Sequence, residues 1–404
     1  MGVFVGADRG GERDRGALMS AETTIRIAVI GAGSMGAHTA PVYARLPRLK
    51  IVAFCDTAPG RAGEVAADFN RETEGGALAF SSYKALTGGC AYDAAYIACP
   101  PDIQVEIACA EMERGVHVMT QVPAAFTLQE CRALVDTVRK TGVTYVLAEQ
   151  ARYWDFIRRW RDMALRGEFG KIVYAEGAYL HYEPRWDFFV DSETGRSVVT
   201  GDAACHNDPR YRRSWRYRFF AEPIYYLPHT LSPLLSITGG RISKVACFGT
   251  RTGGYSHQGF EVCDLQEAVM YNEDDVVFSV KTGFTTPHGL NPLTGAHWYQ
   301  IKGTGASVET PRSCLDGGKL WTAERGWERA ELSCLLGDAD EFARSITHGG
   351  ADMEPAVQFT RAIRGEGTPE MDVYAAVETA APAILAAESC RRGGVTLEVP
   401  DFRL

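Results

Sequence analysis

A glycine motif set between a strand and a helix is the feature that most constrains this fold. Residues 31–36 read GAGSMG, a G-x-G-x-x-G pattern that follows the apolar run 25–30. Helical spacing of small and apolar residues continues from it to about residue 46. Glycines so placed permit a tight turn, let backbone N–H groups approach a pyrophosphate, and allow close packing of helix on strand. The pattern predicts a dinucleotide site on a strand–turn–helix unit.

A carboxylate further along the chain strengthens this prediction. Asp56 ends the next apolar run, residues 51–56, about 20 residues after the motif, where it can accept both ribose hydroxyls. Its charge would repel a 2'-phosphate, although Arg61 could offset that repulsion. We therefore expect NAD, with NADP less favoured. The alternative is an ordinary glycine turn and an Asp that merely ends a strand.

The periodicity divides the chain into two α/β parts. Short strands (25–30, 51–56, 77–80, 93–99, 116–120, 144–148) alternate with helices (59–70, 103–114, 128–141), which predicts a parallel Rossmann sheet over residues 24–150. After a helix at 155–166, alternating runs (172–182, 242–250, 265–271, 276–284, 297–302) have little helix between them. They predict an α+β domain over 151–404 with a large, mostly antiparallel open sheet and a C-terminal helix at 373–391. Residues 1–23 lack periodicity, and we expect a mobile tail there.

Charge and composition narrow the class of partner. The formal net charge is -9, which argues against nucleic acid or an anionic membrane as the main partner and favours a small molecule. No apolar run is long enough to span a bilayer or act as a signal peptide, so we expect a cytoplasmic protein. The eleven cysteines include no C-x-x-C pair and are expected to be reduced, and no zinc spacing occurs, so we expect no metal.

Two further stretches, together with the glycine motif, carry a family resemblance. Residues 96–102 read YIACPPD and residues 111–119 read EMERGVHVM, and with GAGSMG they resemble the Gfo/Idh/MocA oxidoreductases. The resemblance implies a Rossmann domain, a second domain whose open sheet often forms the oligomer interface, and action on C–OH groups of sugars and cyclitols. A homodimer or homotetramer is therefore expected. The expected cofactor-binding residues are Gly31, Gly33, Ser34, Met35, Gly36, Asp56, Pro100, Pro101, Gln121 and Pro123; for Gln121, loop packing is an equally good role.

The positions at which this chain departs from the family's motifs say more about its chemistry than the positions that match. Its usual Glu-Lys-Pro reads Gln121-Val122-Pro123, and valine can neither donate, accept nor carry charge. Its usual Asp-x-x-x-His-x-x-Asp reads YYLPHTLS over residues 225–232, which keeps only His229. One branch without the lysine, which includes NAD-dependent α-N-acetylgalactosaminidases, is similar at residues 122–125, 148–150, 177–181, 215–216 and 226–229. Carried over, the catalytic candidates are Glu149, Tyr179, Tyr226 and His229, and the substrate-binding candidates are His181, Trp215, Arg216 and Tyr225.

Each of these candidates has a plainer interpretation. Tyr226 and His229 are spaced i, i+3 and would share one face of a helical turn, but a satisfied core histidine beside packing tyrosines has the same spacing. Tyr179 and His181 alternate along a strand, which sheet packing also explains. Glu149 lies where ligands bind at the carboxyl edge of the sheet, and it could equally cap the next helix. The arginines at 210, 212, 213, 216 and 218 suit a solvated or inter-subunit loop better than a site for an anionic sugar.

Together these features predict an NAD(P)-dependent oxidoreductase that acts on a secondary C–OH of a sugar, sugar derivative or cyclitol without the usual lysine. The alternative is a glycoside hydrolase or lyase in which oxidation is transient: the ketone acidifies the adjacent C–H, a base such as Tyr179 or His229 removes that proton, and a substituent leaves. A third alternative is a non-catalytic dinucleotide-binding sensor.

Overall fold

The structure is a computed structural model that describes residues 23–183, 189–198, 205, 207–250, 260–285, 295–335, 341–346 and 348–404. The tail predicted over residues 1–23 lies outside these ranges, apart from Thr23.

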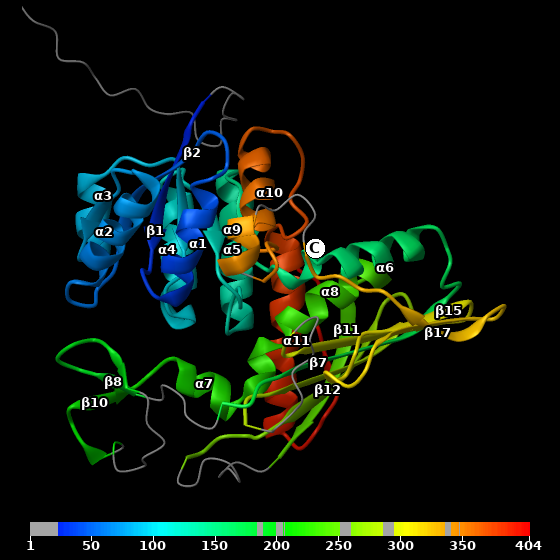
Figure 1. Ribbon diagram of the computed structural model, residues 1–404. Coiled ribbons are helices and arrows are strands. Elements are labelled where there is room, and N and C mark those ends of the chain that lie inside the picture. Colours follow the sequence, from blue (N-terminus) through cyan, green and yellow to red (C-terminus); the bar gives the residue numbers. More distant parts are fainter. Residues whose placement is uncertain are drawn as a thin grey trace, which may run out of the picture.

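The first sheet has six parallel strands in the order β3-β2-β1-β4-β5-β6 (Figure 1), which confirms the predicted Rossmann topology. Its strands are β1 (Ile25–Ile30), β2 (Leu49–Cys55), β3 (Leu78–Phe80), β4 (Ala94–Ile97), β5 (His117–Thr120) and β6 (Tyr145–Leu147). Its helices are α1 (Ser34–Tyr43), α2 (Arg61–Thr73), α3 (Tyr83–Gly89), α4 (Pro101–Glu113) and α5 (Leu128–Thr141). Helix α3 was not predicted from the sequence.

Local sequence explains where these helices begin and end. Helix α5 starts at a capping box: the Thr127 hydroxyl accepts from the Glu130 backbone, and the Glu130 carboxylate accepts from the Thr127 backbone. It ends at Gly142, whose φ of 67° is the left-handed conformation that glycine adopts without strain. The observed bounds are those predicted from the sequence.

The second sheet has nine strands in the order β17-β16-β15-β14-β7-β13-β12-β11-β18. Only β7 and β13 pair in parallel, so the predicted mostly antiparallel sheet is confirmed. The strands are β7 (Ile172–Leu180), β11 (Ile242–Gly249), β12 (Gln266–Asn272), β13 (Val277–Gly283), β14 (His297–Gly303), β15 (Ala306–Glu309), β16 (Gly318–Thr322), β17 (Gly326–Ala330) and β18 (Leu397–Glu398).

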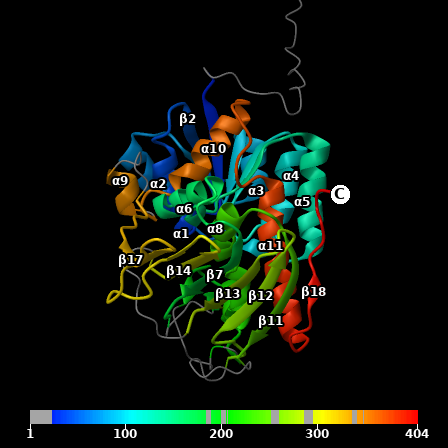
Figure 2. The same ribbon diagram turned by 90° about the vertical axis from the view of Figure 1, so that its right-hand side faces the viewer.

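Helices cover the face of this sheet that is turned toward the first domain (Figures 1 and 2). Those that contact its strands are η3 (Pro223–Tyr226), α8 (Pro228–Thr238) and α11 (Val373–Arg391). The other helices that follow the first sheet in the chain are η1 (Ala151–Tyr153), α6 (Asp155–Leu165), α7 (Arg216–Ala221), α9 (Glu341–Ile346) and α10 (Met353–Ile363). Helices α6 and α11 match the prediction. The expectation of little helix between the strands fails over residues 216–238, where α7, η3 and α8 lie.

One glycine lets α8 approach the sheet closely. A Cβ on Gly177, in the middle of β7, would lie only 2.3 Å from Cγ2 of Thr230 on α8. Since real Cβ atoms do not come so close to another carbon, only glycine allows this spacing. The absence of a side chain at residue 177 thus sets how near α8 lies to β7.

The C-terminal part of the chain returns to the first domain. Ala356, Phe359 and Ile363 on α10 belong to the same buried cluster as Ile27 of β1 and Tyr96 of β4. Helix α10 therefore supplies part of the cover of the Rossmann sheet, so the division into residues 24–150 and 151–404 remains a prediction.

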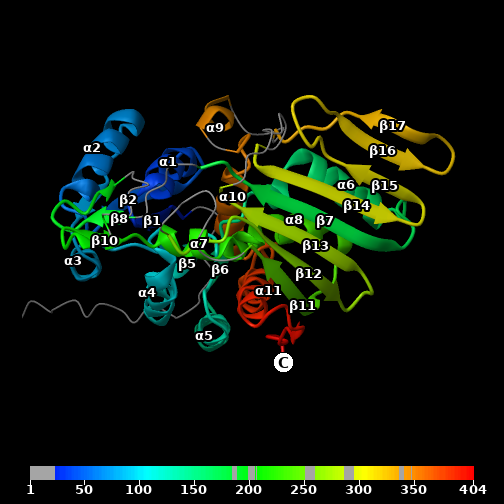
Figure 3. The same cartoon turned by 90° about the horizontal axis from the view of Figure 1, so that it is seen from below.

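A small three-stranded sheet projects from the second domain. Its strands β8 (Phe189–Asp191), β9 (Ser197–Val198) and β10 (Tyr211–Arg213) are arranged in the order β10-β8-β9, and all pair antiparallel. Figures 1 and 3 show β8 and β10 beside α2 and α3 of the first domain.

Candidate active site

The carboxyl ends of the first sheet gather the predicted cofactor residues. The strand register aligns Ile30 with Cys55 and with Ile97, Ile97 with Thr120, and Thr120 with Leu147. The residues that follow these strands therefore lie along one edge, which is where ligands bind in open parallel sheets. Gly31, Asp56, Gln121 and Glu149 all belong to this edge.

The glycine motif has the geometry that a bound dinucleotide needs. A Cβ on Gly31, which has a φ of 98°, would lie 2.5 Å from the Ala98 carbonyl carbon, and one on Gly36 would lie 2.0 Å from the Gly31 oxygen. At Gly33, by contrast, nothing lies within 4 Å of an added Cβ. Gly31 and Gly36 are thus fixed by packing, whereas Gly33 leaves open space before the N-terminus of α1, where a pyrophosphate would bind.

Asp56 is tied to the glycine loop as well as being available to a ribose. Its Oδ2 accepts from the Ala32 N–H at 2.9 Å, and its Oδ1 accepts from the Ala58 N–H at 2.8 Å. Each carboxylate oxygen has a second lone pair for a hydroxyl. Arg61 donates through Nε to the Ala32 carbonyl at 2.7 Å and lies 3.8 Å from Glu64. Since Arg61 is engaged in this way, the arrangement favours a ribose diol over a 2'-phosphate.

The wall after β5 is fixed by a buried amide. Gln104 donates to the carbonyls of Gln121 (2.8 Å) and Pro123 (2.9 Å), which holds the loop around the buried Val122. The Gln121 side-chain nitrogen donates to the Tyr96 hydroxyl. This hydrogen bond within the protein corresponds to the packing role that was considered for Gln121. Contact of this loop with the nicotinamide remains a prediction. The same holds for contact of the cofactor with Pro100 and Pro101, which lie at the start of α4.

A carboxylate and an imidazole meet where the two domains join. Glu149, which follows β6 and has no exposed surface, places Oε2 2.6 Å from Nδ1 of His229 on α8. Its other oxygen accepts from the Ala151 N–H at 2.9 Å, which is the capping role considered for it, while its catalytic role remains a prediction. A carboxylate this close to Nδ1 forms an ion pair with the ring when the ring is charged, and it leaves Nε2 to exchange a proton with a ligand.

Three further rings surround His229. Tyr226 stacks on it with centroids 5.5 Å apart, so the i, i+3 pair does share one face. Tyr179 of β7 lies 5.4 Å from the His229 ring. His297 of β14, not singled out in the sequence, lies 4.5 Å from Tyr179. The Tyr299 hydroxyl donates its one proton to the His229 carbonyl at 3.1 Å, so at 2.9 Å it accepts from Nδ1 of His297. A lone histidine in an apolar strand gives no motif that could have identified it.

Burial sets the protonation of these rings. It raises the pKa of Tyr179 well above the usual value, with Tyr226 and Glu149 adding to the effect, and it raises the pKa of Tyr226 to about 12 despite Arg216 nearby. It also lowers the pKa of His297 well below the usual value, and His229 and other histidines add to this. Both tyrosines are therefore protonated and His297 is neutral near pH 7. The tyrosines can donate hydrogen bonds but are poor bases, which favours His229 for that role.

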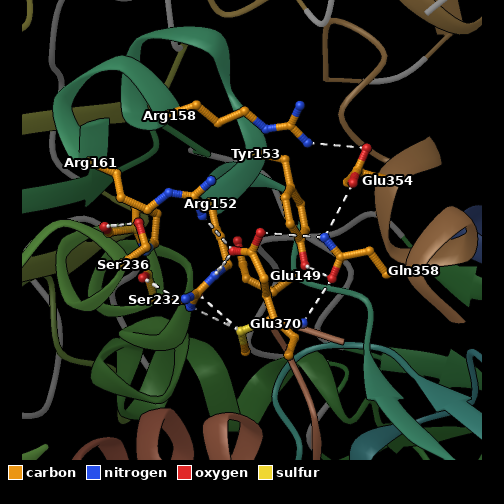
Figure 4. A network of polar contacts seen from close by, with 12 residues as sticks. Glu149, Arg152, Tyr153, Arg158, Arg161, Ser232, Ser236, Glu354, Gln358 and Glu370 are labelled. Carbon is orange, nitrogen blue, oxygen red and sulfur yellow. Dashed lines mark hydrogen bonds and ion pairs between the residues drawn. The ribbon is translucent and has the colours of Figure 1, made fainter. Parts of the chain in front are cut away.

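A polar network that includes Arg152, Arg161, Ser232 and Glu370 (Figure 4) joins the segment after Glu149 to helix α8. Arg152, three residues after Glu149, donates to Glu370 at 3.1 Å and to the Ser232 hydroxyl at 3.2 Å, and Ser232 lies three residues after His229 on α8. Arg161 contacts the same Glu370 oxygen at 2.8 Å. The turn that carries the carboxylate is thus bound directly to the helix that carries the imidazole.

The predicted substrate-binding residues do not all gather here. His181 packs edge-on against Tyr179 at 4.6 Å, and Trp215 reaches the cluster through Phe219, which is 4.2 Å from Tyr226. Tyr225 points elsewhere: its ring packs 5.0 Å from Phe126. The structure therefore brings His181 and Trp215 toward the cluster and turns Tyr225 away from it; substrate contact by any of them remains a prediction.

The arginine cluster is divided among separate partners. Arg210 pairs with Asp191 at 2.8 Å. Arg216 lies 4.9 Å above Trp215, and Arg218 lies 4.0 Å above Phe126. These three arginines therefore have separate stacking and ion-pair partners within the chain.

A six-stranded Rossmann sheet whose ligand edge faces a second α+β domain, with an oriented histidine at the junction, defines the class of dinucleotide-dependent oxidoreductases. Residues 25–149 match the family described as "Oxidoreductase family, NAD-binding Rossmann fold". Over this domain the chain is similar to the Gfo/Idh/MocA oxidoreductases, and it is an enzyme with an NAD-binding Rossmann domain.

Relatives match over both domains. A glycosyl hydrolase family 109 protein of Saccharopolyspora erythraea is 26% identical over 97% of this chain and 86% of its own. An alpha-N-acetylgalactosaminidase of Bacteroides fragilis is 24% identical over 94% of this chain and 92% of its own. Among solved structures, levoglucosan dehydrogenase in complex with NADH and L-sorbose superimposes with a TM-score of 0.72 at 20% identity, covering 94% of this chain and all of that one (100%).

Proposed function

We propose that this protein oxidises a secondary C–OH of a sugar, sugar derivative or cyclitol, with His229 as the group that takes the hydroxyl proton. The observation that carries the proposal is the 2.6 Å contact between Glu149 and His229 at the ligand edge of the NAD-binding sheet. NAD, when bound, supplies the hydride acceptor. The residue that usually assists the proton transfer in the family is replaced by Val122, so an oriented histidine is the proton acceptor that this chain offers.

The surrounding residues have distinct parts in this step. The Glu149 carboxylate orients the His229 ring and stabilises it when it becomes charged. The neutral hydroxyls of Tyr179 and Tyr226 lie against the same ring and can donate hydrogen bonds to substrate oxygens. Neutral His297 keeps a second positive charge away from His229.

A second candidate function is redox-neutral cleavage, in which the ketone is transient and the adjacent C–H loses a proton before a substituent leaves. The relatives named as glycosyl hydrolase family 109 proteins and as an alpha-N-acetylgalactosaminidase favour it. The raised pKa of Tyr179 makes His229 the better base for that proton as well.

The two candidates differ in their use of NAD and in hydrogen exchange. The protein should be incubated with N-acetylgalactosaminides and a panel of sugars and cyclitols in deuterated water, with NADH followed by absorbance. An oxidoreductase forms one NADH per product and has no reason to exchange the adjacent hydrogen. Redox-neutral cleavage needs only catalytic NAD and places deuterium on the carbon next to the oxidised one. Absence of both NADH and exchange with every substrate would refute both candidates and leave the sensor.

The open face of the nine-stranded sheet suits a homo-oligomer, either a dimer or a tetramer. Figure 3 shows this face with no described helix over it. Five side chains on it are at least 39% exposed: Phe248, Val269, Tyr271, Val277 and Trp327. A row of exposed apolar groups on one face favours burial against a second copy. The mass in solution, measured by light scattering for wild type and Phe248→Glu, tests this assignment.

We place the enzyme in the cytoplasm. The structure adds one observation: no helix in the described ranges has the length and apolarity needed to cross a bilayer.

A further inference from the structure

The hairpin formed by residues 189–198, named here the cap hairpin, crosses from the second domain to the loop that follows Asp56. An added Cβ on Gly195 would lie 3.2 Å from Cβ of Ala58 and 3.4 Å from Cδ of Pro59. Next to it, Arg196 Nη2 lies 3.4 Å from Glu64 Oε1 on α2. The tip of the hairpin therefore rests on the segment that immediately follows the ribose-binding carboxylate.

The tip of the cap hairpin is a turn held by hydrogen bonds to Asp191. Asp191 Oδ1 accepts from the backbone N–H groups of Glu193 (2.9 Å) and Thr194 (3.0 Å), and the Gly195 N–H donates to the Asp191 carbonyl at 2.8 Å. The second Asp191 oxygen is held by Arg210 at 2.8 Å. Asp191 is nearly buried, so the turn keeps one shape as it reaches across to the first domain.

Position gives the hairpin its function. The pyrophosphate site at Gly33 and the ribose carboxylate Asp56 fix the direction of a bound dinucleotide along the sheet edge, with the adenosine end toward the loop at residues 57–60. Figures 1 and 3 show β8 and β10 at that end of the first domain. The contact with Ala58 places the cap hairpin beside the route by which adenosine enters and leaves.

We propose that the cap hairpin closes the adenosine half of the NAD site and controls how fast the cofactor exchanges. The inference rests on the NAD-binding assignment but not on the substrate or the net reaction. In this proposal Arg210, expected from the sequence in a solvated or inter-subunit loop, stabilises the turn of the cap hairpin through Asp191. Slow exchange would keep one NAD bound through many turnovers of a redox-neutral cycle, and in a dehydrogenase it would make NADH release the slow step.

A reversible cross-link tests the proposal. Ala58→Cys/Gly195→Cys would place two Cβ atoms close to the ~3.5–4.5 Å that a disulfide spans. Protein loaded with labelled NAD and then oxidised should release it about tenfold or more slowly into excess unlabelled NAD, and oxidised apoprotein should take up NAD correspondingly slowly. A thiol reductant should restore both rates. Ala58→Ser/Gly195→Ser under the same oxidant is the matched control, and each single cysteine variant controls for the native thiols.

A charge exchange gives a second measurement. Arg196→Glu and Glu64→Arg should each speed NAD release by about two- to fivefold, because an exposed ion pair contributes little, and the double variant should return toward the wild-type rate. Equal rates of NAD exchange before and after reduction of the disulfide would overturn the cap. Failure of the unmodified protein to bind NAD would instead refute the cofactor assignment, and the cap with it.

Discussion

Replacing Gly177 by alanine should damage the site without touching any residue that carries its chemistry. The new Cβ would meet Thr230 Cγ2 at 2.3 Å, whereas carbon atoms in contact prefer about 3.5–4.0 Å. Helix α8 must therefore retreat from β7 by about 1 Å or more, and His229 precedes Thr230 on that helix. Overpacking of this kind lowers the free energy of unfolding by about 1–3 kcal/mol. Replacing a glycine within a strand offsets about 0.5–1 kcal/mol of that loss.

Activity should fall further than stability. A shift of about 1 Å in a catalytic group can cost about a hundredfold in rate, so kcat on the identified substrate should drop by that order while the melting temperature falls by only a few degrees. Thr230→Ser removes the clashing methyl and keeps the hydroxyl. Gly177→Ala/Thr230→Ser should therefore regain much of the lost kcat, although Trp298 O, at 3.2 Å from the new Cβ, still limits the fit.

The control is Thr230→Ser alone, which loses one buried methyl, worth about 0.8 kcal/mol, and should retain most of its activity. Turnover and thermal unfolding of the four proteins complete the cycle. If the double variant is no more active than Gly177→Ala, or if Gly177→Ala has wild-type turnover, the spacing of α8 from β7 does not position His229.

Three other results are expected. Asp56→Ser should weaken NAD binding and narrow the preference over NADP in titrations, because the charge that repels a 2'-phosphate is gone; tighter binding of NADP than NAD by wild type would contradict this. His229→Ala should lower kcat by about a hundredfold or more, whereas Val122→Ala should cost little turnover, and small effects from both would remove His229 from the mechanism. Burial lowers the pKa of His117 from 6.5 to about 4. As the pH falls, the unfolded chain binds this proton first, so the contribution of His117 to the free energy of unfolding should fall by about 2 kcal/mol between pH 7 and pH 5. Urea unfolding at the two pH values should show a smaller loss for His117→Asn; an unchanged loss would mean that His117 titrates normally.

The Rossmann half of the fold was predictable because its signals are local. Each strand and the glycine motif lie in a few consecutive residues, and Asp56 follows the motif at a fixed distance, so the topology and the NAD assignment followed from the sequence. The nine-stranded sheet was predictable in type for the same reason: alternation marks each strand. Neither signal says which segments meet, which is why the return of α10 to the first sheet and the position of β8–β10 came only from the structure.

In the candidate site, too, local contacts were predictable from the sequence and long-range contacts were not. The i, i+3 spacing brought Tyr226 and His229 together correctly, since a helical turn is a local feature. The contact of Glu149 with His229 joins residues on different domains and depends on the approach of α8 to β7, which no spacing encodes. His297 was missed because a buried histidine in a strand looks like any other core residue until its neighbours are known.

The contribution of α10 to the first core has a consequence for biosynthesis. Ala356, Phe359 and Ile363 cover the Rossmann sheet, but they leave the ribosome about 200 residues after β6 is complete. At about 5–20 residues per second, the sheet waits roughly 10–40 s with part of its apolar face bare. We expect the nascent first domain to expose this part of its apolar surface during that interval, and fragments that stop before residue 353 to be more prone to aggregate.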